Sequence, residues 1–161
     1  MMIMRLDDDS YFLGKLPEDP FLKMQRGRLK YMYKRSSNEI HGIQHLWDVS
    51  IPFSRHGLTT FKELGWVHGN KKYDGIEPYN NFHVTNIDEW RTPEAKAWFR
   101  AMDAYTGFSK YRFSDANVHA IFIGLFLKAK EVLVWSELRY VHNTNDDWSY
   151  PPSTDGWLVR Q

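Results

Sequence analysis

The 161-residue sequence combines an ordinary hydrophobic content of 42% with a net charge of +1 and no cysteine. This length favours one domain with its own core, and the lack of cysteine excludes disulfides, thiolate metal sites and a cysteine nucleophile. The near-zero charge excludes a global field that attracts polyanions. Because the sequence shows no secretory signal and no apolar run of membrane-spanning length, we expect a cytoplasmic or other intracellular protein without a membrane span.

Aromatic residues are the most distinctive part of the composition, with seven Trp, nine Tyr and ten Phe. Large rings bury much area each and dominate interfaces as well as cores. We expect one core of this size to be too small for every ring. The surplus predicts a surface that a protein partner covers, in a homo-oligomer or a hetero-oligomer.

The N-terminal part predicts an extended arm followed by a basic helix. Residues 1–18 form the arm, and Asp19 with Pro20 marks the start of a helix that runs to about Lys34. Six basic residues and no acid lie between Pro20 and Asn38: Lys23, Arg26, Arg28, Lys30, Lys34 and Arg35. Such a helix could bind nucleic acid, an anionic bilayer surface or an acidic protein. The alternative is an ordinary exposed face whose charge nearby acids, including Asp7, Asp8 and Asp9, partly neutralise.

The next segment predicts a short helix that ends near Trp47. Ser36 and Glu39 have the spacing of a capping box. On that helix His41, His45 and Asp48 would fall on one stripe, and two imidazoles with a carboxylate suit a divalent ion, with His56 or His68 as a fourth ligand. The alternative is a solvated helix face. Residues 49–53 then predict a strand or extended segment, and Thr60–Glu63 predicts another helix start that Gly65 ends.

A second histidine motif follows the predicted loop of residues 68–81. Phe82–Thr85 predicts a short strand, and His83-Val84-Thr85 within it resembles half of the paired His-x-Thr signature of the two-histidine phosphoesterases. In that family two histidines act as acid and base across a phosphate. Here the second copy would be His119-Ala120-Ile121, where Ile121 lacks the hydroxyl group. The resemblance therefore covers one histidine only.

The clearest helices lie in the C-terminal half, over residues 93–106 and 115–130. Thr92 and Pro93 mark the start of the first helix, and Ser114 and Asp115 mark the start of the second. The second helix is apolar on all sides, which predicts a buried central position. Residues 131–142 fit either a strand or a continuation of the helix. Beyond them, residues 143–161 form a tail in which Trp148, Tyr150 and Trp157 stand beside prolines, as docking anchors or as plugs of the protein's own core.

Together these patterns predict an α+β fold dominated by helix, in a single compact domain of residues 1–161. Residues 19–142 form its core, between the extended N-terminal and C-terminal arms. We expect a non-enzymatic structural or interaction subunit of a larger assembly, such as a viral particle or a multi-subunit complex, with no cofactor. One alternative is a metal- or histidine-dependent phosphoester hydrolase that uses His41, His45, Asp48 and His83. The other is a nucleic-acid-binding protein that uses the basic helix of residues 23–35.

Overall fold

The protein is seen here as a computed structural model that describes residues 1–67 and 72–142. Its centre is a mixed four-stranded sheet with the strand order β1-β6-β3-β7. These strands are β1 Met2–Leu6, β6 Phe82–Asn86, β3 Tyr31–Tyr33 and β7 Val132–Val134. β6 pairs antiparallel with β1 and with β3, whereas β3 and β7 run parallel. The mixed α+β fold predicted from the sequence is confirmed.

Two smaller ladders flank the central sheet. β2 Ser10–Phe12 pairs antiparallel with β8 Tyr140–His142, and β4 Ser36–Asn38 pairs antiparallel with β5 Ile76–Pro78. Both ladders join segments that lie far apart along the chain. They therefore bring turn and strand-end residues of distant segments together.

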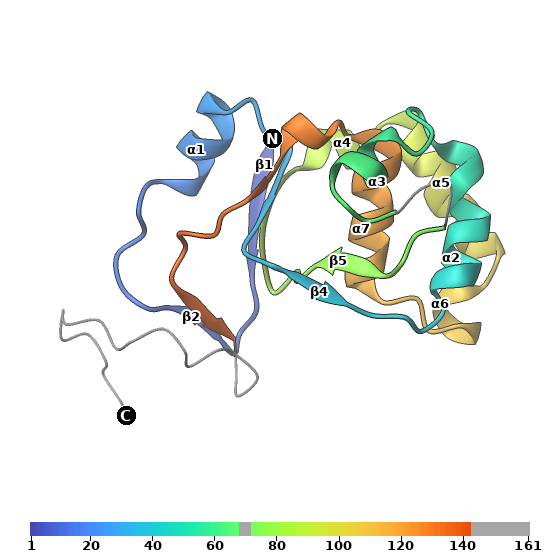
Figure 1. Cartoon of the computed structure of the whole chain (residues 1–161), viewed down its shortest axis with the longest axis horizontal. Helices are drawn as coiled ribbons and strands as arrows, with labels where there is room; N and C mark the ends of the chain where they lie inside the picture. Colours follow the sequence, from blue (N-terminus) through green and yellow to red (C-terminus); the bar gives the residue numbers. More distant parts are fainter. Residues whose placement is uncertain (68–71, 143–161) are drawn as a thin grey trace.

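The helices are divided between the two faces of the central sheet. α1 Pro20–Arg26 lies on one side, and the other helices gather on the opposite side (Figure 1). That opposite layer contains α2 Ile43–Ser50, η1 Ile51–Phe53, α3 Thr59–Glu63, α4 Ile87–Trp90, α5 Pro93–Ala104, α6 Gly107–Lys110, α7 Asp115–Phe126 and η2 Ala129–Glu131. None of the helices within residues 1–67 and 72–142 is both long and apolar enough to cross a membrane.

Alternation along the strands explains the two cores. Met32 packs in the smaller core beside α1, whereas its neighbours Tyr31 and Tyr33 pack in the larger core beneath the helices. Phe82 and Val84 likewise face α1. Because successive side chains of a strand point to opposite faces, the residues between them face the helix layer.

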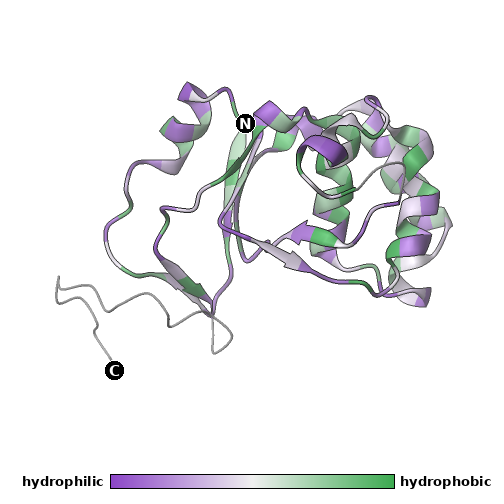
Figure 2. Cartoon of the chain, in the orientation of Figure 1, coloured by the Kyte–Doolittle hydropathy of each residue, from purple (hydrophilic) through white to green (hydrophobic). Residues whose placement is uncertain are grey.

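α7 is the central helix of the larger core. The Ser114 side chain accepts a hydrogen bond from the Asn117 amide and caps its start, and ten of its residues are buried. Figure 2 shows this helix as hydrophobic over most of its length. Its predicted central position is confirmed, although the helix ends at Phe126 rather than near residue 130.

The N-terminal predictions need two corrections. Residues 2–6 are extended as expected, but β1 is a paired strand of the sheet rather than part of an arm. The prediction of a basic helix is wrong beyond Arg26, because α1 ends there: Gly27 caps it, and Arg28 takes a left-handed backbone with φ 51°. The chain then continues as β3, so the basic residues do not form one helical stripe.

Three further segments differ from their sequence patterns. Ser36–Asn38 pairs as β4 instead of capping a helix, and the predicted strand over residues 49–53 is helical in α2 and η1. Within the predicted loop 68–81, Ile76–Pro78 forms β5. Residues 131–142, for which the sequence fits either helix or strand, contain the two strands β7 and β8.

Candidate metal centre

Two carboxylates and one imidazole converge where the turn between β1 and β2 lies beside the end of β8. Asp7 and Asp9 belong to the turn between β1 and β2, and His142 is the last residue of β8. The pairing of Ser10 with His142 brings these segments together. One ligand atom from each of Asp7, Asp9 and His142 lies within 4.8 Å of the others. Carboxylate oxygens with an imidazole nitrogen suit a divalent cation such as Mn²⁺, so the residues present fit a metal ion.

The connection between β5 and β6 supports this cluster. Tyr79 Oη lies 2.9 Å from His142 Nδ1, on the ring edge away from Nε2. Asn81 Nδ2 donates to Asp7 Oδ2 at 2.8 Å and lies 3.0 Å from His142 Nε2. Such outer contacts fix the orientation of metal ligands. The turn is fixed as well, because the Asp7 amide donates to the Asn81 carbonyl at 3.0 Å.

Arg5 connects the cluster to the start of α7. Its guanidinium pairs with Asp7 at 2.8 Å and with Asp115 at 2.9 Å. The hydrogen bond to Asp115 raises the pKa of Arg5. Burial acts to raise the pKa of Asp115, but the hydrogen bond and charge of Arg5 outweigh it, and the pKa is lowered. Both groups therefore stay charged at neutral pH.

A pocket of about 410 Å³ lies beside Arg5, between the sheet and the helices. It is lined by Ile3, Arg5, His83, Thr85, Ile87, Trp90, Phe99 and His119. Arg5 and His83 are cross-strand partners, as are Ile3 and Thr85, so the sheet contributes four of these residues from one face. Trp90 stacks on Phe122 at 3.7 Å and gives the pocket a fixed aromatic wall.

The two histidines of this pocket are close together and uncharged. The ring centroids of His83 and His119 are 4.8 Å apart. His119 Nδ1 lies 2.7 Å from Tyr31 Oη, and His83 Nδ1 lies 3.0 Å from the Asn80 carbonyl. Burial lowers the pKa of both, and with the nearby His83 it brings the pKa of His119 to about 3. Neutral imidazoles can exchange hydrogen bonds with hydroxyl groups of a ligand without carrying charge.

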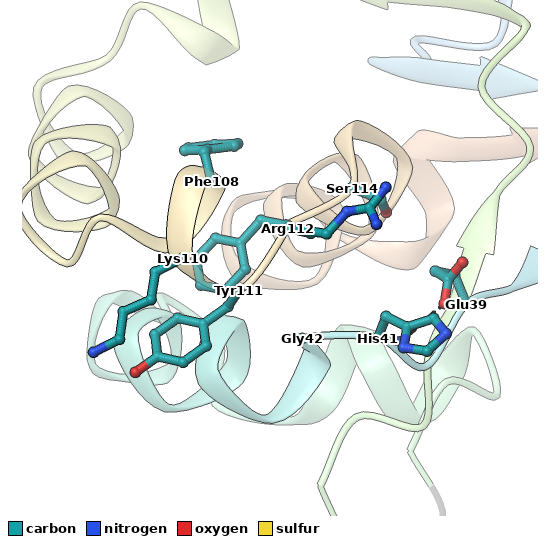
Figure 3. Close-up of a pocket in the computed structure, with 9 residues that line it drawn as sticks. Glu39, His41, Gly42, Phe108, Lys110, Tyr111, Arg112 and Ser114 are labelled. Atoms are coloured by element: carbon teal, nitrogen blue, oxygen red, sulfur yellow. Dashed lines mark hydrogen bonds between the residues drawn. The ribbon is translucent and has the colours of Figure 1, made fainter.

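The structure does not bring His41, His45 and Asp48 together as a metal-binding group. Among the residues that it describes, the group with metal-binding geometry is that of Asp7, Asp9 and His142. His45 stacks on Tyr111 at 3.7 Å, and Asp48 accepts from Gln44 at 2.7 Å. His41 lines a separate pocket near Arg112 (Figure 3).

The remaining predicted site residues are dispersed. His56 lines another surface pocket, whereas His68, Trp148, Tyr150 and Trp157 lie outside the described residues. Lys23 pairs with Glu18 at 2.5 Å, and Lys30 pairs with Glu89 and Glu131 at 3.2 and 3.1 Å. The Lys34 ammonium donates to the Ser136 carbonyl at 2.5 Å, and the Arg35 guanidinium lies over the Tyr79 ring at 4.4 Å. Arg26 and Arg28 are exposed.

The sequence reasoning missed the cluster itself. The sequence pattern predicts Asp7, Asp8 and Asp9 as countercharges for the basic helix and gives His142 no role. An Asp-x-Asp pair directly after a predicted strand is the signal that could have found the first two ligands. No spacing rule connects them with His142, because the β2–β8 pairing alone brings it near.

Comparison with known proteins gives consistent matches. The model of the glycolipid 2-alpha-mannosyltransferase family matches residues 2–154. The glycolipid 2-alpha-mannosyltransferase of Saccharomyces cerevisiae is 27% identical over 149 residues, which cover 89% of this chain and 34% of the relative. The alpha-1,2 mannosyltransferase KTR1 of the same yeast is 27% identical over 150 residues, covering 86% and 37%.

Solved structures share the fold. The mannosyltransferase Ktr4p from S. cerevisiae in complex with GDP superposes with a TM-score of 0.70 at 17% identity, covering 88% of this chain and 40% of that one. The Mn/GDP form of core-mannan synthase A from Aspergillus fumigatus gives 0.71 at 20% identity, covering 88% and 42%. This chain spans about a third of the length of the curated relatives that it matches.

These matches correct the functional predictions. The prediction of a structural subunit, viral or otherwise, is wrong, because the matching family consists of glycosyltransferases. The phosphoester hydrolase and nucleic-acid-binding alternatives are wrong for the same reason. The prediction of no cofactor is also contradicted, since one of the solved neighbours is a Mn/GDP form.

The family assignment rests on nearly the whole chain, since the matched residues 2–154 include the metal cluster and the pocket beside it. The shared fold agrees with it independently. This chain therefore belongs to the glycolipid 2-alpha-mannosyltransferase family.

Proposed function

We propose that this chain forms the metal- and sugar-binding part of a mannosyltransferase that moves mannose from a guanosine diphosphate donor to a hydroxyl group of an acceptor. The observation that carries the proposal is the convergence of Asp7, Asp9 and His142 beside a hydroxyl-compatible pocket. Family membership supports the reaction class, and the GDP and Mn/GDP neighbours support the donor and the cation.

Each group has a defined role in this proposal. Asp7, Asp9 and His142 would hold the divalent cation, which neutralises the charge of a diphosphate leaving group when it is bound. Arg5 holds Asp7 in place and keeps a positive charge in the lining of the pocket. His83 and His119 orient sugar hydroxyls as neutral hydrogen-bonding groups, while Trp90 and Phe99 exclude water.

A pair of neighbouring substitutions tests the cation site. Asp7→Asn removes a charge from the cluster, whereas Asp8→Asn removes the same charge from an exposed residue outside it. We expect Asp7→Asn to weaken Mn²⁺ binding by at least about 10- to 100-fold, the range found for residues that only support metal ligands. Asp8→Asn should leave it unchanged. Equal Mn²⁺ affinity of both variants and the parent protein, measured by calorimetry, would contradict the proposal.

The transfer reaction itself is tested with GDP-mannose and a mannose acceptor in the presence of Mn²⁺. We expect product formation that chelation abolishes and that Asp7→Asn lowers together with Mn²⁺ affinity. Transfer that persists without a divalent cation would rule out the metal-dependent form of the proposal.

The other predictions concern residues or properties that lie beyond these observations. We retain as a proposal that Trp148, Tyr150 and Trp157 form a docking surface for a protein partner. The oligomeric state, the intracellular location and the helix-dominated single domain of residues 1–161 also stay predictions.

A further inference from the structure

A second pocket, of about 640 Å³, lies beside the start of α7 and is separate from the metal cluster. Its polar lining includes Glu39, His41, Arg112 and Ser114, and its aromatic lining includes Phe108 and Tyr111. Figure 3 shows Arg112 extended past Ser114 toward Glu39 and His41, whereas Lys110 points the other way. The pocket therefore combines a planar cationic donor, a carboxylate acceptor, an exposed ring and a half-buried ring.

Arg112 is available to a ligand. Its side chain is exposed, and its guanidinium makes no ion pair or hydrogen bond with any residue in the described ranges. Glu39 Oε1 accepts from the His41 amide at 2.9 Å, which places the carboxylate at the rim without a cationic partner there. Arginine supplies several donors in a fixed plane, and a carboxylate supplies only acceptors.

The aromatic wall, formed by Phe108 and the half-buried Tyr111, is held in place by neighbouring rings. Phe108 is 44% exposed, and its ring meets the buried Phe113 ring edge-on at 5.7 Å. The Tyr111 ring is stacked on His45 at 3.7 Å. An exposed ring that packs against a buried one offers a rigid apolar face at low entropic cost.

Backbone strain and close packing fix this wall. Thr106 and Arg112 both have left-handed backbones, with φ 56° and 54°, on either side of α6. Such conformations cost about 1–2 kcal/mol each for ordinary residues and persist where the surroundings enforce them, often at ligand sites. The backbone also packs closely here, since a Cβ on Gly42 would lie 2.4 Å from the Tyr111 carbonyl oxygen and one on Gly107 would lie 1.9 Å from the Phe113 ring.

The position of the pocket connects it with the metal cluster. Ser114 lines the pocket, and the next residue, Asp115, pairs with Arg5, which in turn pairs with Asp7. The pocket thus borders the start of α7, and Arg5 connects that start with the metal cluster.

We propose that this pocket is a second carbohydrate subsite, which binds the non-reacting sugars of an oligosaccharide acceptor. The inference rests on the proposed function for the identity of the sugar. A polyol needs donors, acceptors and an apolar face together, and this lining supplies Arg112, Glu39 and Phe108. The carboxylate at the rim disfavours an anion such as phosphate, which would need cationic donors alone.

Binding of mannose and of a linear mannotetraose to the metal-free, nucleotide-free protein tests the subsite. We expect the tetrasaccharide to bind at least about 10-fold more tightly than the monosaccharide, with NMR shifts at residues 108–114. Arg112→Gln and Phe108→Ala should each weaken tetrasaccharide binding by about 10-fold, the loss of one good polar or aromatic contact. The matched controls are Arg100→Gln, on the exposed side of α5, and Phe21→Ala, whose ring is 40% exposed on α1.

The proposal would be overturned if mannose and mannotetraose bound with equal affinity. It would also be overturned if the control variants lost as much tetrasaccharide affinity as Arg112→Gln and Phe108→Ala. So would displacement of the tetrasaccharide by inorganic phosphate, which would indicate an anion site. Because this binding needs neither cation nor donor, it is independent of the transfer reaction. If transfer occurs, Arg112→Gln should raise KM about 10-fold for the tetrasaccharide alone and leave kcat unchanged. Tetrasaccharide binding without transfer would instead contradict the proposed function and leave the subsite intact.

Discussion

At the scale of single residues, Glu77 is the most unusual carboxyl group of the described structure. Its side chain is 6% exposed and accepts from Ser37 Oγ at 3.2 Å and from Ser114 Oγ at 3.4 Å. Burial raises its pKa from 4.5 to about 7, the two serine hydroxyls oppose this rise, and the charges of Glu39 and Asp115 add to it. Glu77 is therefore partly protonated at neutral pH, next to the residue that caps α7.

This shift makes the stability of the protein depend on pH. The folded pKa lies above the unfolded value, so the folded state binds more protons between about pH 4.5 and 7, and stability falls as pH rises through that window. Glu77→Gln should remove this dependence, so that its effect on the free energy of unfolding is about 3 kcal/mol more favourable at pH 8 than at pH 4.5. Urea unfolding at both pH values measures this difference in the free energy of unfolding. Glu63→Gln, at an exposed carboxyl group, is the control. An identical pH dependence in Glu77→Gln and the parent protein would contradict the assignment.

Tyr79 shows how one hydroxyl group can orient an imidazole of the proposed metal site. It lies 2.9 Å from His142 Nδ1 and fixes the orientation of the ring. Tyr79→Phe keeps the ring beneath Arg35 and removes only this contact. We expect Mn²⁺ affinity to fall by about 10-fold, with little change in stability. Tyr11→Phe, at an exposed tyrosine, is the control for calorimetric titration; a loss of affinity in that variant too would show a nonspecific effect.

At the scale of elements, the packing of α7 depends on the absence of a side chain at Gly124. A Cβ at this position would lie 2.1 Å from the Phe61 ring of α3, and Phe61 is fully buried. Gly124→Ala gains about 1 kcal/mol of helix propensity but forces the ring to move, which costs about 1–3 kcal/mol or more. We expect net destabilisation in thermal unfolding, relieved by adding Phe61→Leu. If Gly124→Ala alone were more stable than the parent protein, this would contradict the prediction and show that α3 can move without an energetic penalty.

The same scale shows which parts of the fold can be predicted from sequence. The start of α5 follows from Thr92 with Pro93, and the start of α7 follows from Ser114; both caps act locally, and both predictions are confirmed. The basic helix failed because the segment after Gly27 gains more from pairing between β6 and β7 than from continuing α1. The prediction that Ser36 caps a helix is wrong because Ser36 belongs to β4, which pairs with β5 some 40 residues further along the chain. Tertiary pairing overrides local signals of this kind.

At the scale of the whole molecule, the aromatic residues are divided between two hydrophobic cores and the surface. Trp47, Trp66, Trp98 and Trp135 are buried, and Trp90 stacks against Phe122. The two faces of the sheet create two cores that both contain rings, whereas Tyr11, Phe21 and Phe108 are exposed, so the docking of surplus rings on a partner stays a prediction. The sequence could predict a mixed α+β fold, but it could not predict the metal cluster, because Asp7 and His142 come together only when β2 pairs with β8.

The β2–β8 ladder has a thermodynamic consequence of its own. It is short and peripheral, and its two strands stand near opposite ends of the described chain. A cation shared by Asp7, Asp9 and His142 would close the intervening polypeptide into a ring and oppose fraying of these strands, while α7 lies in a separate core. Addition of Mn²⁺ should therefore slow amide hydrogen exchange in β2 and β8 and leave α7 unaffected. Uniform slowing over the whole protein would instead mean that these outer strands open only when everything unfolds.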